Sequence, residues 1–223
     1  MAHAFFLGID FAERESDGAA TPTLAILEKE QEQSDVAASY RLDHIQDFAD
    51  APSPPEFADY IQGLVAKQPY IGRTNIIVNR ATEPGQALVD ALADRGLDPV
   101  GATLTGGSGA VAGERDDIGV HLGTSDAVRT LGELYRDRRL AIDDHTTEAA
   151  SALARGVQRV AEVLDEADGN QETPEAAGST LDDLNQVEAS LTSAALAAWF
   201  GAERSFDPTQ HLKEDPQTQR PEG

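Results

Sequence analysis

The sequence predicts a single α/β domain built on one mixed β-sheet with helices on its faces. A buried apolar run opens the chain, segments of strand and helix character then alternate, and the last third reads mainly as helix. Three opening strands followed by helix, strand, helix and strand are typical of an α/β order with a mixed sheet. The 223 residues suffice for one domain with a sizeable buried core.

The predicted strands lie in the first half of the chain. Residues 4–11 form an apolar run ending in Gly8-Ile9-Asp10-Phe11, the pattern of a central strand with an acid at its carboxyl end. Residues 23–29 and 37–48 read as a second and a third strand, which an acidic loop joins as an antiparallel pair. Further strands are expected over residues 74–79 and 99–105.

Capping signals set the predicted helices between and after these strands. Ser53 precedes two prolines and is a plausible N-cap, and Gly96 is expected to end a helix over residues 85–95. Residues 106–119 are a Gly-rich, charged stretch predicted to be a loop. Helices are then expected over 125–138, 146–166 and 184–200, with a short extended piece at 140–142 and a polar linker at 168–179. We expect one domain over residues 1–204 and a disordered polar tail over 205–223.

The charge balance is the most unusual global feature of the composition. Forty acidic residues face 17 basic ones, which gives a formal net charge of −23, and only three of the bases are lysine. Acids are spread along the whole chain, including predicted helix surfaces at Glu162, Asp165 and Glu166. Such a surface suits molar salt, where the Debye length falls to about 3 Å. We therefore expect a halophilic source, in which an acidic charge does not exclude nucleic-acid binding.

Several classes of function lack their usual signals. No apolar stretch is long enough to cross a bilayer, so no membrane association is expected. The opening residues lack a basic n-region, and we expect a cytoplasmic protein without a signal peptide. The chain contains no cysteine and no phosphate-binding loop, because Gly106-Gly107-Ser108-Gly109 lacks the lysine and its spacing. The five histidines show no metal-ligand spacing, and the one dense basic group, Arg136, Arg138 and Arg139, fits a solvated helix end as well as a phosphate contact.

Four stretches of the chain together resemble the ribonuclease H-like superfamily, and within it the nuclease domain of phage terminase large subunits. Residues 7–12 with 23–28 look like the family's first hairpin, and 76–92 like its second acidic strand and following helix. Residues 103–107 look like the next strand and turn, and 188–199 like the last helix. The resemblance implies a ribonuclease H-like mixed sheet, with an antiparallel first three strands followed by parallel ones. The chain shows no phosphate-binding loop of the kind found in the ATPase domain of these subunits, so the resemblance is to the nuclease domain alone.

The same resemblance implies a site where carboxylates from the first strand, the second strand and the last helix hold two divalent metal ions. Hard oxygen ligands suit Mg²⁺ or Mn²⁺, which would activate a water molecule for DNA cleavage. Asp10 matches the first-strand ligand and Glu188 the last-helix acid, and both are the candidate catalytic residues. Asn79 stands where the second strand should end in an acid, and Glu83 follows it by four residues. The candidate metal ligands are therefore Asp10, Asn79, Glu83 and Glu188.

The sequence departs from the family's residue pattern at two places, and these leave the function open between an enzyme and a binding protein. Asn79 brings no negative charge, and Gly123-Thr124 replaces the basic residue that the family has before its next helix. One hypothesis is a metal-dependent endonuclease acting on DNA. The alternative is a catalytically inactive ribonuclease H-like binding or assembly module of phage or prophage origin. A Holliday-junction resolvase and an actin-like ATPase also begin with a Gly-Ile-Asp strand, but the first needs further acids in the last helix and the second another Gly-rich turn. The oligomeric state is not indicated by the sequence.

Overall fold

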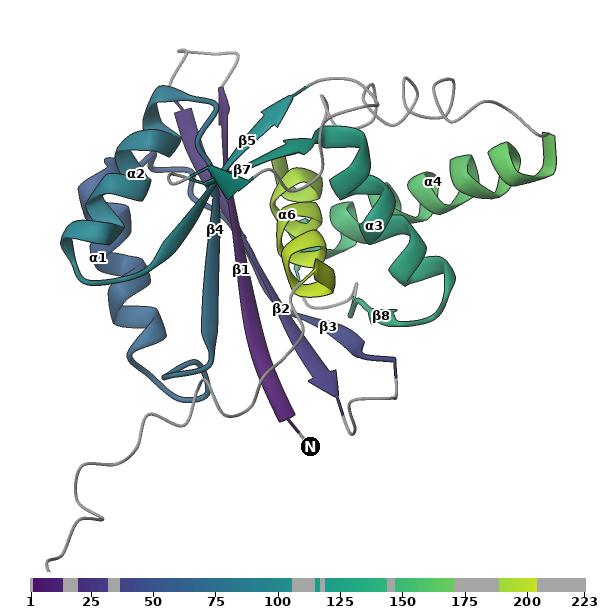
Figure 1. Cartoon of the computed structure of the whole chain (residues 1–223), viewed down its shortest axis with the longest axis horizontal. Helices are drawn as coiled ribbons and strands as arrows, with labels where there is room; N and C mark the ends of the chain where they lie inside the picture. The colour runs from purple at the N-terminus through teal and green to yellow at the C-terminus, as the bar shows by residue number, and fades with distance from the viewer. Residues whose placement is uncertain are drawn as a thin grey trace, which may run out of the picture.

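The computed structural model of the protein describes residues 2–13, 20–31, 37–105, 115–116, 119–143, 147–170 and 189–203. Within these ranges one sheet of eight strands runs in the order β6-β7-β5-β4-β1-β2-β3-β8 (Figure 1). The strands are β1 (Ala2–Glu13), β2 (Ala20–Gln31), β3 (Ser39–Asp47), β4 (Thr74–Asn79), β5 (Pro99–Thr105), β6 (Arg115–Asp116), β7 (Gly119–Gly123) and β8 (Leu140–Ala141).

The directions of the strands confirm the predicted mixed sheet. β1, β2 and β3 pair antiparallel, while β1 pairs parallel with β4, β4 with β5, and β5 with β7. The short β8 lies parallel to β3 at the far edge, and the two-residue β6 is antiparallel to β7. β1 therefore lies at the centre of the sheet, paired on both sides, which explains its almost unbroken apolar sequence.

Alternation along β1 divides the core into two layers. Phe5, Leu7 and Ile9 face one layer, whereas Ala4 and Phe6 face the other. Helices α1 (Pro54–Val65) and α2 (Glu83–Asp94) cover the first face. Helices α3 (Thr124–Arg136), α4 (Glu148–Asn170) and α6 (Ala189–Glu203) cover the second, as Figure 1 shows on the two sides of the strands.

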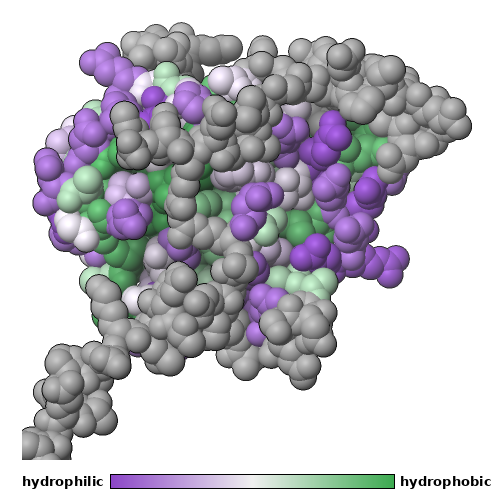
Figure 2. Space-filling model, in the orientation of Figure 1, coloured by the Kyte–Doolittle hydropathy of each residue, from purple (hydrophilic) through white to green (hydrophobic). Residues whose placement is uncertain are grey.

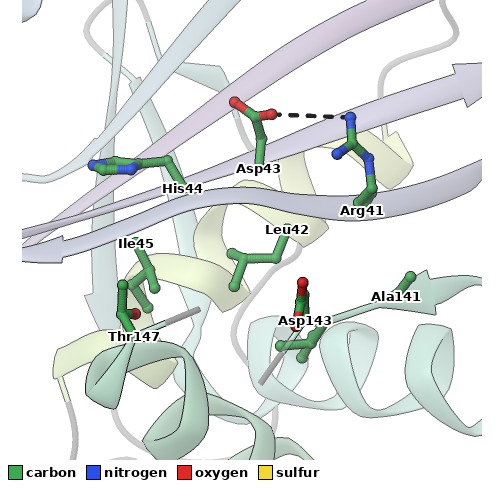
Figure 3. A pocket seen from close by; sticks show the side chains of 9 residues that line it. Arg41, Leu42, Asp43, His44, Ile45, Ala141, Asp143 and Thr147 are labelled. Atoms are coloured by element: carbon green, nitrogen blue, oxygen red, sulfur yellow. Dashed lines mark ion pairs between the residues drawn. The ribbon is translucent and has the colours of Figure 1, made fainter. Parts of the chain in front are cut away.

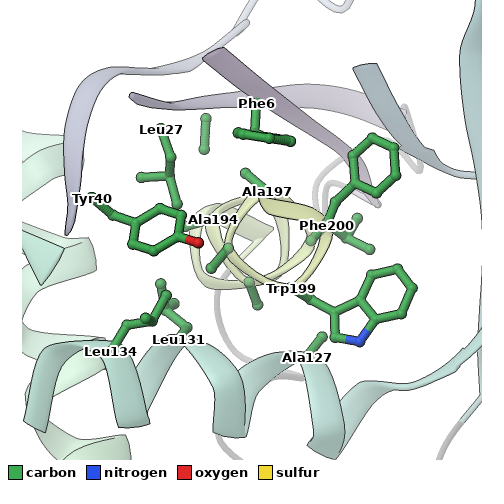
Figure 4. Packing of buried hydrophobic residues seen from close by; sticks show 14 of the residues in the cluster. Phe6, Leu27, Tyr40, Ala127, Leu131, Leu134, Ala194, Ala197, Trp199 and Phe200 are labelled. Atoms are coloured by element: carbon green, nitrogen blue, oxygen red, sulfur yellow. The ribbon is translucent and has the colours of Figure 1, made fainter. Parts of the chain in front are cut away.

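Helix α6 is the central element of the second layer. Every residue from Ser190 to Gly201 is buried, because the sheet packs on one side of the helix and α3 and α4 on the other. A helix that is apolar all round belongs in such an interior position. Figure 4 shows its side chains Ala194, Ala197 and Phe200 enclosed between the sheet and α3. Trp199 is 7% exposed and belongs to this core.

The close approach of α6 to the sheet depends on a glycine in β1. A Cβ atom at Gly8 would lie 1.9 Å from the backbone oxygen of Ser193, which no real contact allows. Polar bonds fix the helix at both ends of this contact. The Ser193 hydroxyl donates to the Thr23 carbonyl at 3.0 Å, and Lys29 Nζ donates to the Gly201 carbonyl at 2.8 Å. The second bond satisfies a carbonyl in the last turn of α6.

The predicted caps are confirmed. α1 begins directly after Ser53, whose N–H and hydroxyl both donate to the Glu56 carboxylate at 2.9 and 2.6 Å. Gly96 follows α2 with a positive φ of 75°, the conformation that glycine adopts at the end of a helix.

The loop predicted over residues 106–119 is wrong at Arg115–Asp116 and at Gly119, and residues 106–114 and 117–118 of it lie outside the described residues. β6 and β7 follow within and after that stretch, and β7 is a full member of the sheet beside β5. α4 also continues to Asn170, past the predicted start of the polar linker. The predicted tail at 205–223, residues 171–179 of the linker and residues 184–188 of the last helix lie outside the described residues. Among the described helices, none is long and apolar enough to cross a membrane.

Candidate functional site

The candidate site lies at the carboxyl end of β1, on the face of the sheet that α6 covers. Asp10 alternates with Ile9 and Phe11, which face α1 and α2, so its carboxylate faces the opposite side. β4 runs parallel to β1 and ends beside it at Asn79. The first strand, the fourth strand and the last helix therefore meet at one point, where Asp10, Asn79 and Thr192 are in contact.

The amide of Asn79 is held in one orientation. Its oxygen accepts a hydrogen bond from the backbone N–H of Ala81 at 3.0 Å, and its nitrogen donates to Asp10 Oδ1 at 2.8 Å. The Ala81 N–H is a donor only, so the amide oxygen must face it and the NH₂ group must face Asp10. A metal ion bound to Asp10 on this side would have to displace an N–H donor. Asn79 therefore presents the wrong end of its side chain to serve as a ligand beside Asp10.

Burial changes the acidity of Asp10. The residue is 7% exposed, and desolvation raises the pKa of its carboxyl from 3.8 to about 6. Hydrogen bonds from Asn79, from the backbone of Phe11 and from Thr192 act in the opposite direction and lower the pKa of Asp10, but by less than burial raises it. Near neutral pH this carboxylate is close enough to its pKa to hold or release a proton.

A second polar pair lies beside the site across two strands. Thr23 is the register partner of Asp10 on β2, and Asp47 is the register partner of Thr23 on β3. The Thr23 hydroxyl donates to Asp47 Oδ1 at 2.7 Å, so this carboxylate is already bonded two strands away from Asp10. Neither residue was predicted from the sequence to belong to the site. The antiparallel register of the first three strands was the one signal that could have placed them in this row.

The structure does not bring Glu83 to the site. Glu83 is an exposed residue in the first turn of α2, and α2 packs against the face of the sheet opposite the Asp10 carboxylate. Its place at a helix N-terminus is favourable for an acid in its own right. Glu188 lies outside the described residues, immediately before α6 in the sequence. Thr192, four residues later in the sequence, was not predicted and is the α6 residue that contacts Asp10.

Within the described part of the chain, no group of three or more His, Asp or Glu side chains could hold a metal ion. Of the described residues, those that meet at the edge supply one carboxylate, one amide donor and one hydroxyl. This set of groups can bind a proton at Asp10, whereas a two-metal site needs several hard oxygen ligands.

The remaining residues singled out from sequence are bonded elsewhere. His44 pairs with Gln46 at 3.2 Å on β3. Arg136 ends α3 and lies 3.8 Å from Asp165, and Arg139 donates to the Ala38 carbonyl at 2.9 Å. Two of the three clustered arginines thus stabilise the contact of α3 with α4 and with the start of β3.

No protein-family model, curated protein or solved structure matches the chain.

Proposed function

We propose that this chain is a catalytically inactive ribonuclease H-like domain, similar to the nuclease domain of phage terminase large subunits, that works as a binding or assembly module. The orientation of Asn79 carries the proposal. Where the family has a second metal-binding carboxylate, the chain places an N–H donor that satisfies Asp10. Because Ala81 fixes this orientation from the other side, the amide cannot rotate without losing a bond.

The convergence of the elements supports the fold relationship. A ribonuclease H-like site would draw its ligands from the ends of the first strand and of the next parallel strand and from the last helix. Here those three elements supply Asp10, Asn79 and Thr192 to a single buried contact. Only one of the three is an acid, which supports the loss of metal chemistry rather than a different architecture.

A metal-dependent endonuclease acting on DNA is the second candidate. It is favoured by the position of Asp10 at this convergence and by Glu188, which precedes the contacting Thr192 by four residues in the sequence. In that case Mg²⁺ or Mn²⁺ would be the cofactor. The two candidates differ in whether the native protein binds a divalent cation through Asp10.

Mn²⁺ titration by calorimetry in high-KCl buffer at pH 8 separates the two candidates. At this pH Asp10, whose pKa is about 6, is ionised in both. We expect no saturable binding by the native protein. We expect Asn79→Asp to gain saturable binding, because it exchanges the amide donor for a second carboxylate beside the first.

Two controls fix the interpretation. Asn75→Asp adds the same charge at the other end of the same strand, beside Phe6, and should gain no binding. The double variant Asn79→Asp with Asp10→Asn should lose what the single variant gained. Saturable binding by the native protein that Asp10→Asn abolishes would replace the module with the nuclease. If Asn79→Asp bound no Mn²⁺, this edge of the sheet would not be a former metal site.

A further inference from the structure

Among the described residues, the outer edge of β3 is open from Leu42 onward. On its inner side the strand pairs with β2 from Ser39 to Asp47. On its outer side β8 pairs only with Tyr40 and Arg41, and among the described residues no strand covers the edge from Leu42 onward. We call the stretch from Leu42 to Asp47 the open β3 edge. An edge of this kind presents unpaired backbone groups to any extended chain that reaches it.

The direction of the backbone groups follows from the bonds at either end. The backbone N–H of Phe48, directly after β3, donates to the carbonyl of Pro22 in β2 at 3.0 Å, so it faces β2. The backbone N–H and C=O groups of successive residues point to alternate sides of a strand. Those of Gln46 therefore also face β2, and those of Ile45 and Asp47 face outward. The register shifts between Ile26 and Leu27 and leaves Asp43 without a partner on β2, so a bulge changes the alternation at this point. The backbone N–H of Tyr40 therefore also faces outward, and it donates to the Arg139 carbonyl at 2.6 Å, where the chain enters β8. The open β3 edge thus continues the line along which β8 is already bonded.

A pocket of about 420 Å³ lies beside this edge, between β3 and the start of α4 (Figure 3). Leu42 and Ile45 point from the strand toward it, and Ala141 and Thr147 border the opposite side. Its volume is within the range of sites that bind ligands. The apolar part of the lining comes from side chains on one face of β3. A strand added to the open β3 edge could therefore bond to its backbone groups and place every second side chain in the pocket.

The charges along the edge select the kind of occupant. Asp43, Asp47 and Asp143 lie along or beside it. The one arginine among the residues that line the pocket, Arg41, is bonded to Glu28 and also lies 3.9 Å from Asp43, so a single base is shared by several acids (Figure 3). A second copy of this chain would bring the same aspartates against each other in a protein of net charge −23. Like charges on opposing strands destabilise the pairing, whereas lysine or arginine opposite them stabilises it.

We infer that the open β3 edge accepts an extended, basic segment of a partner protein as an added strand. The main-chain bonds of Ile45 and Asp47 would hold the segment, and its apolar side chains would enter the pocket between β3 and α4. The inference rests on the proposal that the chain is a binding module, and it is independent of whether Asp10 ever binds a metal ion.

A synthetic hexapeptide of alternating lysine and valine, blocked at both ends, tests the inference by ¹⁵N NMR on the full chain. The titration is made at the lowest KCl concentration that keeps the protein folded. We expect saturable shifts centred on the amides of Ile45 and Asp47, and at least tenfold slower hydrogen exchange of these two amides at saturation. A peptide of alternating glutamate and valine should not bind.

Three variants separate the backbone contribution from the charge contribution. Asp47→Asn removes only the charge, whereas Asp47→Pro removes the charge together with one outward N–H donor, in an edge strand where proline is tolerated. Asp47→Pro should therefore weaken peptide binding at least tenfold relative to Asp47→Asn. Asp47→Lys keeps the donor and reverses the charge, so it should weaken the lysine peptide and allow the glutamate peptide to bind. Asp98→Lys makes the same charge change at an exposed residue between α2 and β5 and should change neither affinity.

Several results would overturn the inference, and shifts that map to another surface are one. The first of the others is peptide binding that Asp47→Pro leaves unchanged. The second is equal binding of both peptides. The third is strong exchange protection of Ile45 and Asp47 before any peptide is added, which would mean that another part of this chain covers the edge. The fourth is a dimer in sedimentation that Asp47→Pro dissociates, which would assign the edge to a second copy. None of these results bears on the Mn²⁺ titration, so the two proposals can fail separately.

Discussion

At the scale of single residues, Asp10 links the chemistry of the site to the stability of the fold. An unfolded chain ionises this carboxyl near pH 3.8, whereas the native protein ionises it near pH 6. Between these values the native state holds a proton that the unfolded state has lost, so stability falls as the pH rises through this window. Well above pH 6, both states are ionised and this contribution to stability is fully lost. Since each pKa unit corresponds to about 1.4 kcal/mol, the ionised Asp10 costs the native state about 3 kcal/mol.

Asp10→Asn should therefore stabilise the protein at neutral pH. The amide is nearly isosteric and carries no charge to desolvate. Its single oxygen can accept from Asn79 but not from all three donors that Asp10 now binds, and this loss reduces the gain. We expect an increase in the free energy of unfolding of about 1–3 kcal/mol at pH 7.5, shrinking to none at pH 4. Urea denaturation at pH 4, 5, 6 and 7.5 measures this increase, with Asp98→Asn as the control for the same substitution at an exposed position. A variant less stable than the native protein at pH 7.5 would contradict the desolvation argument.

Part of the residue-level site could be predicted from sequence, and the limit has a physical reason. Asp10 and Asn79 both end apolar strands, and parallel strands bring their carboxyl ends to one edge, so their contact follows from local patterns. Thr192 could not be predicted, because the rotation of a helix that is apolar all round leaves no stripe to show which side faces the sheet. Glu83 was assigned by sequence spacing alone, and the start of α2 takes it to the other face.

At the scale of elements, the contact of β1 with α6 depends on the missing side chain of Gly8. An alanine there would place its Cβ 1.9 Å from the Ser193 backbone oxygen, and a backbone atom in a buried helix cannot move aside as a flexible side chain can. We expect Gly8→Ala to destabilise the protein by at least about 3 kcal/mol, as overpacking of a tight core does.

Gly63→Ala provides the matched comparison in the same denaturation experiment. Gly63 lies exposed in α1 with nothing within 4 Å of an added Cβ. There the same substitution should stabilise by about 0.5–1 kcal/mol, because alanine loses less backbone entropy in a helix than glycine. If Gly8→Ala were as well tolerated as Gly63→Ala, α6 would not approach β1 as closely as the structure shows.

The predicted bounds of a strand agree with the structure where its local sequence pattern is unambiguous. β4 and β5 have the predicted bounds, since each is a continuous extended run between turn residues. β7 was missed because glycines stand at both of its ends and only Val120 and Leu122 are aliphatic. Its strand character comes from pairing with β5, where Gly101 faces Gly119, and this is a tertiary contact that no local pattern records.

At the scale of the whole molecule, the division between core and surface accounts for where the acids can lie. Both faces of the sheet are apolar, so the charges are left to the outer sides of the helices and to the strand edges. Hydrophilic side chains dominate the outer surface of α3 and α4 in Figure 2, and Glu162, Asp165 and Glu166 are exposed on α4 as the sequence predicted. The 17 basic residues are too few to pair with all 40 acids.

This imbalance predicts that the native state is stabilised by salt. Compaction brings like charges together, and their repulsion opposes folding until ions screen it. The Debye length falls from about 10 Å at 0.1 M to about 3 Å at 1 M, so most of the gain should come over this range. If screening recovers about 3 kcal/mol, the midpoint of thermal unfolding should rise by about 6–12 °C between 0.1 and 2 M KCl.

The effect of screening can be separated from other effects of KCl by removing charge from α4. The double variant Glu162→Gln with Glu166→Gln keeps the size and helix propensity of two exposed side chains and takes away two negative charges. Its unfolding midpoint should exceed that of the native protein at 0.1 M KCl and converge with it at 2 M. A midpoint that does not change with KCl in the native protein would mean that the distributed carboxylates cost the fold nothing. In that case the high acid content would need a cause other than adaptation to salt.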